Sequence, residues 1–166
     1  MAFVLADVGS DSVEIDVLSG EVEYIARVAL GADDETDEVY SVVVVLLRQP
    51  NLPPDRMELM FGITRGIEGG DAPEWISDGL TTKVFLKGAD RQTALDRICT
   101  AAIVVAEHAL PEAITFVTAV PYLPEKALTK YGHICKALRS VGYFGGRGDS
   151  YHGSEIWMLK RRKTET

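Results

Sequence analysis

Apolar and polar residues alternate along the first half of the chain, as they do in strands with one buried face. Val13–Val17 alternates apolar with acidic residues, and the alternation resumes over Val22–Leu30 after the turn-forming pair Ser19–Gly20. A period of two places every second side chain on the same face of a sheet. The pattern therefore predicts a hairpin near the beginning of the chain.

Two more strands are predicted before residue 65. Tyr40–Leu47 is a run of β-branched and other apolar residues, which is typical of a central strand, and Met57–Ile63 resumes the strand pattern. The segment between them, Gln49–Asp55, contains three prolines, which cannot continue a hydrogen-bonded ladder. We therefore expect loops at Gln49–Asp55 and at the acidic segment Ala32–Glu38.

The second half of the chain changes to a helical period. Thr82–Leu86 is predicted as a strand, and the next segment, Arg91–Ala109, has apolar residues at spacings of three and four. Such spacing places the apolar residues on one face of a helix. Asp90 is expected to cap this helix, and Pro111 follows its end.

A second unit of strand and helix follows. Ile114–Val120 is predicted as a strand, Glu125–Ser140 as an amphipathic helix with Gly142 as its C-cap, and Ile156–Leu159 as the last strand. The order is a strand meander followed by β-α-β-α-β. It predicts one α+β domain over residues 1–166, with a mixed sheet, two helices packed on one face and a frayed basic tail over residues 160–166.

Charge is distributed unevenly between the two ends of the chain. Residues 1–38 contain eleven acidic side chains and one basic side chain, whereas residues 121–166 contain nine basic and four acidic ones. The net charge of −8 disfavours attraction of the whole molecule to nucleic acid or to an anionic membrane. Local contacts remain open, including a homo-oligomer in which the acidic and basic ends of two copies pair.

The acidic residues near the N-terminus have two interpretations. The predicted hairpin would present four of them on one face: Glu14, Asp16, Glu21 and Glu23. They form either a solvated sheet surface or a binding surface for a basic protein partner. Trp75, in the glycine-rich segment Gly66–Gly79, would either close the core from outside or contact a partner. Solvation of exposed carboxylates and burial of large aromatic rings are the more common cases.

The segment Gly142–Gly153 is the most suggestive of chemistry. It combines five glycines with Arg147, Ser150 and His152, and such a backbone beside an arginine can hold a phosphate group. Phosphate-binding loops, however, lead from a strand into a helix, and this segment leads from a helix into a strand. We therefore interpret it first as a connection, and alternatively as the site of an enzyme that binds a phosphorylated ligand.

Basic and aromatic residues of the C-terminal third indicate a possible nucleic-acid contact. The candidate residues lie on the predicted helix and on the glycine-rich segment, and they are Lys126, Lys130, Arg147, Tyr151 and His152. The alternative is a solvated helix face, which the charge of the whole chain favours.

No residue pattern indicates a metal site, a cofactor or a membrane-spanning segment. The three histidines lack the spacing of metal ligands, and the two cysteines, Cys99 and Cys135, lie among apolar neighbours in predicted helices. The first residues lack the features of a signal peptide. We therefore expect a cytoplasmic protein with two thiols in its core.

The segment Tyr131–Leu159 is similar to the last helix and strand of the GNAT acetyltransferases. Both have a helix that ends in a glycine–aromatic pair, here Gly142 and Tyr143, before the final strand, and the similarity covers less than a fifth of the chain. The acetyl-coenzyme A signature of that family, R/Q-x-x-G-x-G/A, would follow Ile114–Val120, where this chain reads Pro-Tyr-Leu-Pro. Proline lacks the N–H group that would bind a pyrophosphate there. The resemblance implies an acyltransferase-like enzyme, and the prolines argue against acyl-coenzyme A at this place.

The sequence thus favours a small acidic protein that acts through contacts with another protein and not through catalysis. The first alternative is an acyltransferase-like or phosphate-binding enzyme with its site at Gly142–Gly153. The second alternative is nucleic-acid binding through the basic C-terminal third. No catalytic, cofactor-binding or metal-binding residue is predicted.

Overall fold

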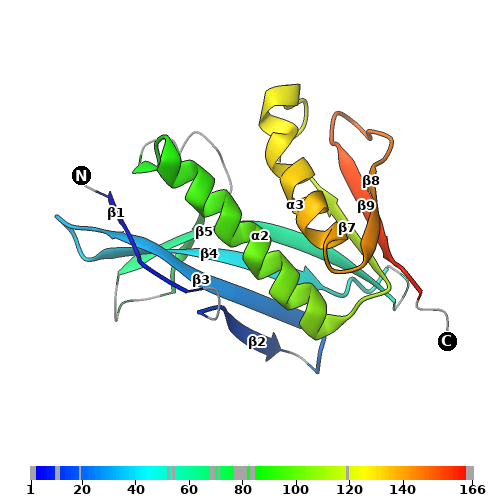
Figure 1. The fold of residues 1–166 in the computed structure, drawn as a ribbon, viewed down its shortest axis with the longest axis horizontal. Helices are drawn as coiled ribbons and strands as arrows, with labels where there is room; N and C mark the ends of the chain where they lie inside the picture. The colour runs from blue at the N-terminus through cyan, green and yellow to red at the C-terminus, as the bar shows by residue number, and fades with distance from the viewer. Residues whose placement is uncertain are drawn as a thin grey trace.

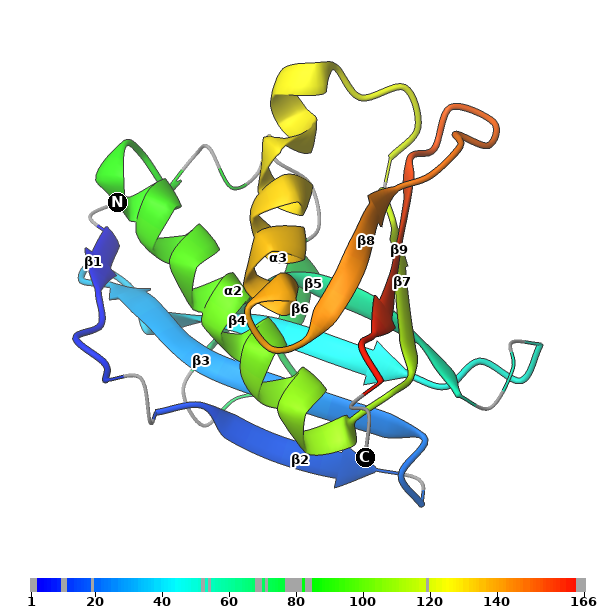
Figure 2. The same ribbon diagram turned by 45° about the vertical axis from the view of Figure 1, so that its right-hand side comes forward.

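The structure, a computed structural model, is a mixed β-sheet with two helices packed on one of its faces (Figures 1 and 2). The predicted α+β class is confirmed, together with the order of a strand meander followed by alternating strands and helices. The structure describes residues 3–9, 12–18, 20–51, 53, 55–67, 70, 72–76, 82, 85–118 and 120–163.

The first half of the chain forms the predicted antiparallel meander. Its strands are β1 (Phe3–Leu5), β2 (Glu14–Leu18), β3 (Glu23–Asp33), β4 (Glu38–Leu47), β5 (Arg56–Ile67) and β6 (Glu74–Ile76). β1 and β2 pair with opposite ends of the same edge of β3, and β6 pairs with β5. The short strands β1 and β6 were not predicted, because three residues are too few to show a period.

The second half alternates helices and strands. Its elements are α2 (Ala89–Ala109), β7 (Ala113–Val117), the 3-10 turn η1 (Glu125–Leu128), α3 (Thr129–Arg139), β8 (Tyr143–Arg147) and β9 (Ile156–Arg161). The strands lie in the order β1-β3-β4-β5-β7-β9-β8 across the sheet. Among the described residues, the strand pairs are antiparallel except for β5 with β7.

The main core lies between α2 and the long central strands. Every second residue of β3 and β4 points toward the helices and is buried, and these residues are Tyr24, Ala26, Val28, Leu30, Tyr40, Val42, Val44 and Leu46. α2 packs on both strands through a stripe of small and apolar residues: Ala94, Ile98, Ala101, Ala102, Val105 and Ala106. The alanines let the helix axis approach the sheet closely, and the period of the stripe is the one that the sequence predicted.

The sheet divides between β5 and β7. These two strands pair through three residues only, Arg56–Glu58 with Ala113–Thr115. On the same edge of β5, pairing resumes with β6 at Ile63, so residues 59–62 have no strand partner there among the described residues. Figure 2 shows β7, β8 and β9 turned steeply away from the plane of β3, β4 and β5. The division leaves an opening that α2 and α3 border.

Arg97 ties α2 to a bulge in β3. The register of β3 against β4 shifts between Ala29 and Gly31, and at this bulge the Leu30 carbonyl accepts a hydrogen bond from the Ala6 N–H at 2.9 Å. The half-buried guanidinium of Arg97 donates from Nη1 to the carbonyls of Ala29 and Leu30 at 3.0 Å and from Nη2 to the carbonyl of Ala6 at 2.6 Å. One side chain thus connects the helix, the central strand and the segment after β1.

Two predicted elements are wrong near α2. Thr82–Leu86 was expected to be a strand, but Thr82 and Phe85 are helical and the Leu86 N–H donates to the Thr82 carbonyl at 2.8 Å. A helical turn lets the consecutive residues Phe85 and Leu86 both reach the core, where Phe85 stacks on Tyr40 with ring centroids 4.4 Å apart. Asp90 is not the cap of α2, because Gly88 occupies that position and no side chain bonds the free N–H groups.

The segment Gly142–Gly153 is not a flexible connection. Its first part is the edge strand β8, and the pair His152–Gly153 forms a tight turn between the bridge partners Tyr151 and Ser154. Both turn residues have positive φ angles, as a two-residue hairpin turn requires. Gly145 has a φ of +138° and lies so close to the Met158 carbonyl that a Cβ atom would not fit. Gly145 therefore serves backbone packing between β8 and β9.

Other boundaries differ from the prediction by a few residues. β3 and β4 extend into the predicted acidic loop, which leaves bends at residues 34–37, and the predicted helix Glu125–Ser140 begins as a 3-10 turn. Gly142 follows the end of α3 with a φ of +97°, although the C-cap position is Ser140. The expected tail is partly ordered, since Lys160 and Arg161 belong to β9. Ser19 of the predicted first turn lies outside the described residues.

The role of Arg97 is testable by substitution. Arg97→Ala removes the guanidinium donor from the carbonyl groups of Ala29 and Ala6 and one of two donors from that of Leu30, and we expect it to lower the free energy of unfolding by about 2–3 kcal/mol. The matched control is Arg91→Ala on the same helix, for which we expect a change within about 0.5 kcal/mol because Arg91 forms no ion pair in the described part of the chain. Urea unfolding measures both values, and equal effects would contradict the assigned role.

Candidate functional site

The predicted acidic residues lie on the sheet face that the helices leave uncovered. Glu14 and Asp16 of β2 are exposed and stand opposite Arg27 and Ile25 of β3, and Glu23 points to the same side. Directly paired residues share a face, and the alternate residues of β3 point toward α2. Glu21 lies in the turn between the two strands with a φ of +70°. The structure thus brings three of the four acidic candidates onto one face.

Trp75 lies on this uncovered face of the sheet as well. Its ring covers Gly62 so closely that a Cβ atom there would lie 2.8 Å from the nearest ring carbon. Gly62 pairs with Val43, and Val43 with Arg27, so the three strands carry these residues in one row. The side chain remains 42% exposed, so the ring covers β5 and also faces solvent.

The predicted basic set is divided among different surroundings. Arg147 donates two hydrogen bonds to Glu125 and one to Glu155, each at 3.0 Å, and these carboxylates raise its pKa. Tyr151 and His152 stand at the tip of the β8–β9 hairpin with their ring centroids 4.2 Å apart. Lys126 is exposed on η1.

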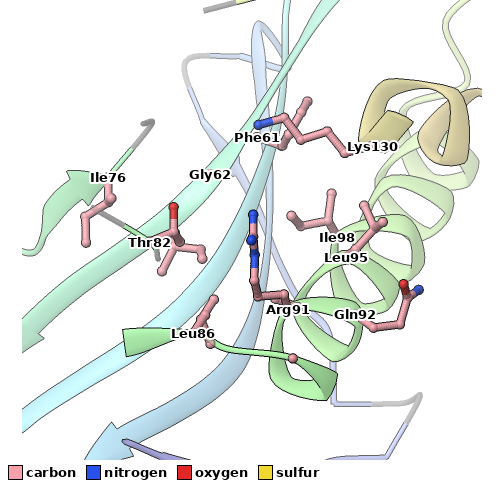
Figure 3. A pocket seen from close by; sticks show the side chains of 13 residues that line it. Phe61, Gly62, Ile76, Thr82, Leu86, Arg91, Gln92, Leu95, Ile98 and Lys130 are labelled. Atoms are coloured by element: carbon pink, nitrogen blue, oxygen red, sulfur yellow. The ribbon is translucent and has the colours of Figure 1, made fainter. Parts of the chain in front are cut away.

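Lys130, the remaining member of the set, points into a cavity. The cavity has a volume of about 460 Å³ and lies between β5, β6 and the two helices. Figure 3 shows the side chains of Arg91 and Lys130 extending into it from α2 and α3, while Phe61 and Ile76 border it from the sheet side. Its walls are mostly apolar, and its other polar side chains are Thr82 and Gln92.

The charges in this cavity are unbalanced. None of the described residues that line it is acidic, although two of them, Arg91 and Lys130, are basic. Neither forms an ion pair in the described part of the chain. Burial lowers the pKa of Lys130, and the positive charge of Arg91 lowers it further. An anion in the cavity would relieve both effects, because it would supply the missing opposite charge.

Two backbone features add to the attraction for an anion. Gly88, at the beginning of α2, lines the cavity, and the N-terminus of a 21-residue helix presents partial positive charge. The edge of β5 at residues 59–62, which has no strand partner among the described residues, also borders this region and can offer backbone groups for hydrogen bonding. A ligand with both a phosphate and amide groups would satisfy these partners.

A second cavity adjoins the first at the division of the sheet. It has a volume of about 370 Å³ and is lined by β5 on one side and by Val117 and Thr118, after the paired part of β7, on the other. Phe61 and Lys130 line both cavities. Together the two cavities form an elongated space, which we call the cleft.

The two cysteines are not candidates for chemistry. Cys135 is buried and Cys99 is half-buried, and both thiols are free. Burial raises the pKa of each thiol to about 11, so that few are thiolates at neutral pH.

Among the described residues, no three His, Cys, Asp or Glu side chains are placed to hold a metal ion. In the same part of the chain, no helix has the length and apolarity needed to cross a bilayer.

Comparisons with protein-family models, with curated proteins and with solved structures gave no significant match.

Sequence reasoning missed Arg91 and the cavity. Arg91 and Lys130 are 39 positions apart and belong to different helices, so no local motif connects them. A signal existed at Arg91, since the first turn of a helix favours acidic residues and a basic one there is unfavourable. Lys130 was named as a candidate, but for an exposed helix face and not for a cavity.

Removal of the positive charge at Arg91 tests the electrostatics of the cavity. In the Arg91→Gln variant we expect the pKa of Lys130 to rise toward the ordinary lysine value, because one of the two causes that lower it disappears. NMR titration of the lysine side chains measures this change. Gln92→Ala, which alters the same wall without changing its charge, should leave the pKa of Lys130 where it is. An unchanged pKa in Arg91→Gln would show that the two cations do not interact.

Proposed function

We propose that the protein binds an elongated, anionic small molecule in the cleft between β5 and the two helices. The observation that carries this proposal is the pair Arg91 and Lys130, two cations that share an apolar cavity with no carboxylate among its described lining residues. Arg91 is exposed and Lys130 is half-buried, and a cation with a pKa perturbed by burial and by a neighbouring charge, placed in a cavity, is typical of a functional site. A bound anion would pair with both cations.

The shape of the cleft supports a ligand with two parts. The end near Gly88 and Arg91 offers a helix N-terminus and a guanidinium, which suit a phosphate group. The other end runs along residues 59–62 of β5 toward Val117 and Thr118 and suits an extended arm with amide groups. Coenzyme A contains both parts, a phosphorylated nucleotide and an arm with two amides.

The resemblance of Tyr131–Leu159 to the acetyltransferases supports the same ligand class and makes acyl transfer the activity to test. The cleft replaces Gly142–Gly153 as the candidate place, because that segment forms β8 and a turn, and Arg147 is held by two carboxylates. The prolines at 121 and 124 do not weigh against the cleft, since neither lines it.

Ligand binding is tested by thermal unfolding and by calorimetry. Coenzyme A at a concentration of 100 Kd should raise the free energy of unfolding by about 2.7 kcal/mol. Inorganic phosphate at the same concentration should raise it less. Arg91→Gln and Lys130→Gln should each weaken binding by about 10- to 100-fold, which corresponds to the loss of one hydrogen bond to a charged group.

Lys136→Gln is the matched control for that experiment. It removes one positive charge from α3 at an exposed position outside the cleft. We expect its affinity to equal that of the unchanged protein. An equal loss in all three variants would indicate nonspecific charge attraction, and the absence of any stabilisation by coenzyme A or phosphate would refute the proposed function.

A second candidate function is contact with a basic protein through the uncovered sheet face. The supporting observation is the cross-strand row Asp16, Ile25, Val45 and Met60, in which a carboxylate adjoins apolar side chains and Met60 is 39% exposed. The exposed part of Trp75 lies on the same face. Such a mixture of apolar and acidic groups suits a partner with a basic rim.

Charge reversal on this face tests the second candidate. In affinity capture from cell lysate at low salt, the Asp16→Lys, Glu23→Lys double variant should lose a partner that the unchanged protein retains, because the partner would meet like charges. The matched control is Asp34→Lys, Asp37→Lys, which changes exposed carboxylates at the β3–β4 turn. Equal capture by both double variants would exclude the sheet face as the contact.

A further inference from the structure

Lys130 occupies the junction of the cleft. It lines both cavities, and its Nζ atom lies 6.0 Å from the ring centroid of Phe61 and 5.5 Å from that of Tyr131. Glu23 and Glu58 line the second cavity, but neither forms an ion pair with Lys130, and Glu58 accepts a hydrogen bond from Gln49. The amine is therefore half-buried against two aromatic rings and lacks a carboxylate partner.

These surroundings increase the fraction of Lys130 in the neutral amine form, which is the nucleophilic form. Apolar walls penalise the ammonium ion, and the nearby guanidinium of Arg91 adds repulsion, so that burial first and Arg91 second lower the pKa of Lys130. The same guanidinium attracts an anionic ligand into the adjoining space. Lys130 thus places an amine with a lowered pKa beside a cavity in which Arg91 can hold an activated, negatively charged reactant next to it.

We propose that Lys130 is a modification site, whose amine accepts an acyl group from an anionic, activated acyl compound bound in the cleft. This inference rests on the proposed function and deepens it, because it names the reactive group of the ligand. Two compounds share the required chemistry, an acyl thioester of coenzyme A and an acyl phosphate. In each, a carbonyl with a good leaving group is joined to phosphate groups that Arg91 and the beginning of α2 can hold.

The reaction is a balanced acyl transfer. The Nζ lone pair attacks the carbonyl carbon, a new amide C–N bond forms, and the bond from the carbonyl carbon to sulfur or to the phosphate oxygen breaks. The amine loses one proton to the leaving thiolate or to solvent, and no oxidation or reduction occurs. The product is an acyl-lysine without positive charge, so the repulsion between Lys130 and Arg91 ends and one of the two groups that attract the anion is lost.

Other lysines provide internal controls for this reaction. Lys126 is four residues earlier and exposed on η1, and Lys136 is exposed on α3. Neither lines the cleft. A purely chemical acylation would modify these exposed amines as well, whereas a reaction directed by the cleft would favour Lys130.

The experiment compares three acyl donors by peptide mass spectrometry. The full chain is incubated separately with acetyl-coenzyme A, with acetyl phosphate and with the uncharged reagent p-nitrophenyl acetate, and acetylation of Lys130 is measured relative to that of Lys126. We expect Lys130 to react at least about tenfold faster than Lys126 with an anionic donor, because the cleft holds that donor beside the Lys130 amine. The ratio of Lys130 to Lys126 acetylation should be smaller with p-nitrophenyl acetate than with an anionic donor. In the Arg91→Gln variant, the ratio with an anionic donor should fall to the ratio that p-nitrophenyl acetate gives with the unchanged protein.

The outcomes separate this inference from the proposed function. Modification at lower concentrations of acetyl-coenzyme A than of acetyl phosphate would identify the thioester as the donor, and the reverse would identify the acyl phosphate. Binding of coenzyme A without acetylation of Lys130 by either anionic donor would overturn the inference and leave the proposed function standing. Equal reaction of Lys126 and Lys130 with all donors would also overturn it. Absence of both coenzyme A binding and Lys130 acetylation would refute both the inference and the proposed function.

Discussion

Three residue pairs join the two halves of the sheet, and the shape of the molecule depends on them. Arg56–Glu58 and Ala113–Thr115 form the single parallel ladder of the described strands, and the N–H groups of Glu112 and Ala113 reinforce it by donating to the Asp55 carbonyl. Parallel strands need a crossover, which here is α2. Because α2 is also held on β3 and β4, it determines where β7 begins relative to β5. The cleft starts where this short ladder ends.

Aromatic side chains connect the two halves of the sheet beyond the ladder. Tyr131 of α3 stacks on Trp157 of β9 with ring centroids 4.6 Å apart, and Phe61 of β5 meets Tyr131 edge to face at 5.4 Å. The amine of Lys130 lies near two of these rings, those of Phe61 and Tyr131. Aromatic packing between the two halves therefore forms part of the wall of the cleft.

The parts of the fold that sequence reasoning recovered are those with a long period. The alternation of Val22–Leu30 and the helical spacing over Arg91–Ala109 each extend far enough to identify an element and its buried face. The prediction for Thr82–Leu86 failed because a segment of five residues, four of them apolar or β-branched, fits a strand or a helical turn equally well, and tertiary contact with Tyr40 decided between them. β8 failed because its glycines indicate a loop by composition, while Gly145 in fact allows close contact with Met158.

The candidate site was partly accessible to the same reasoning. Glu14, Asp16 and Glu23 share a face because the period of a strand requires it, and that much could be read from spacing. The cleft could not, because Arg91 and Lys130 come together only through the packing of two helices and the division of the sheet. Local patterns specify which face of an element is apolar, but they do not specify how two distant elements are spaced.

Two arginines on α2 differ in their partners. The guanidinium of Arg97 donates to three carbonyl groups and connects the helix to β3 and to the segment after β1. Arg91, less than two turns earlier, faces a cavity with no acidic group among its described lining residues and repels Lys130. Relief of that repulsion would require only one carboxylate in place of Gln92 or Thr82. A chain with 25 acidic side chains that places none of its described ones in this cavity leaves its two cations available to an anion from outside.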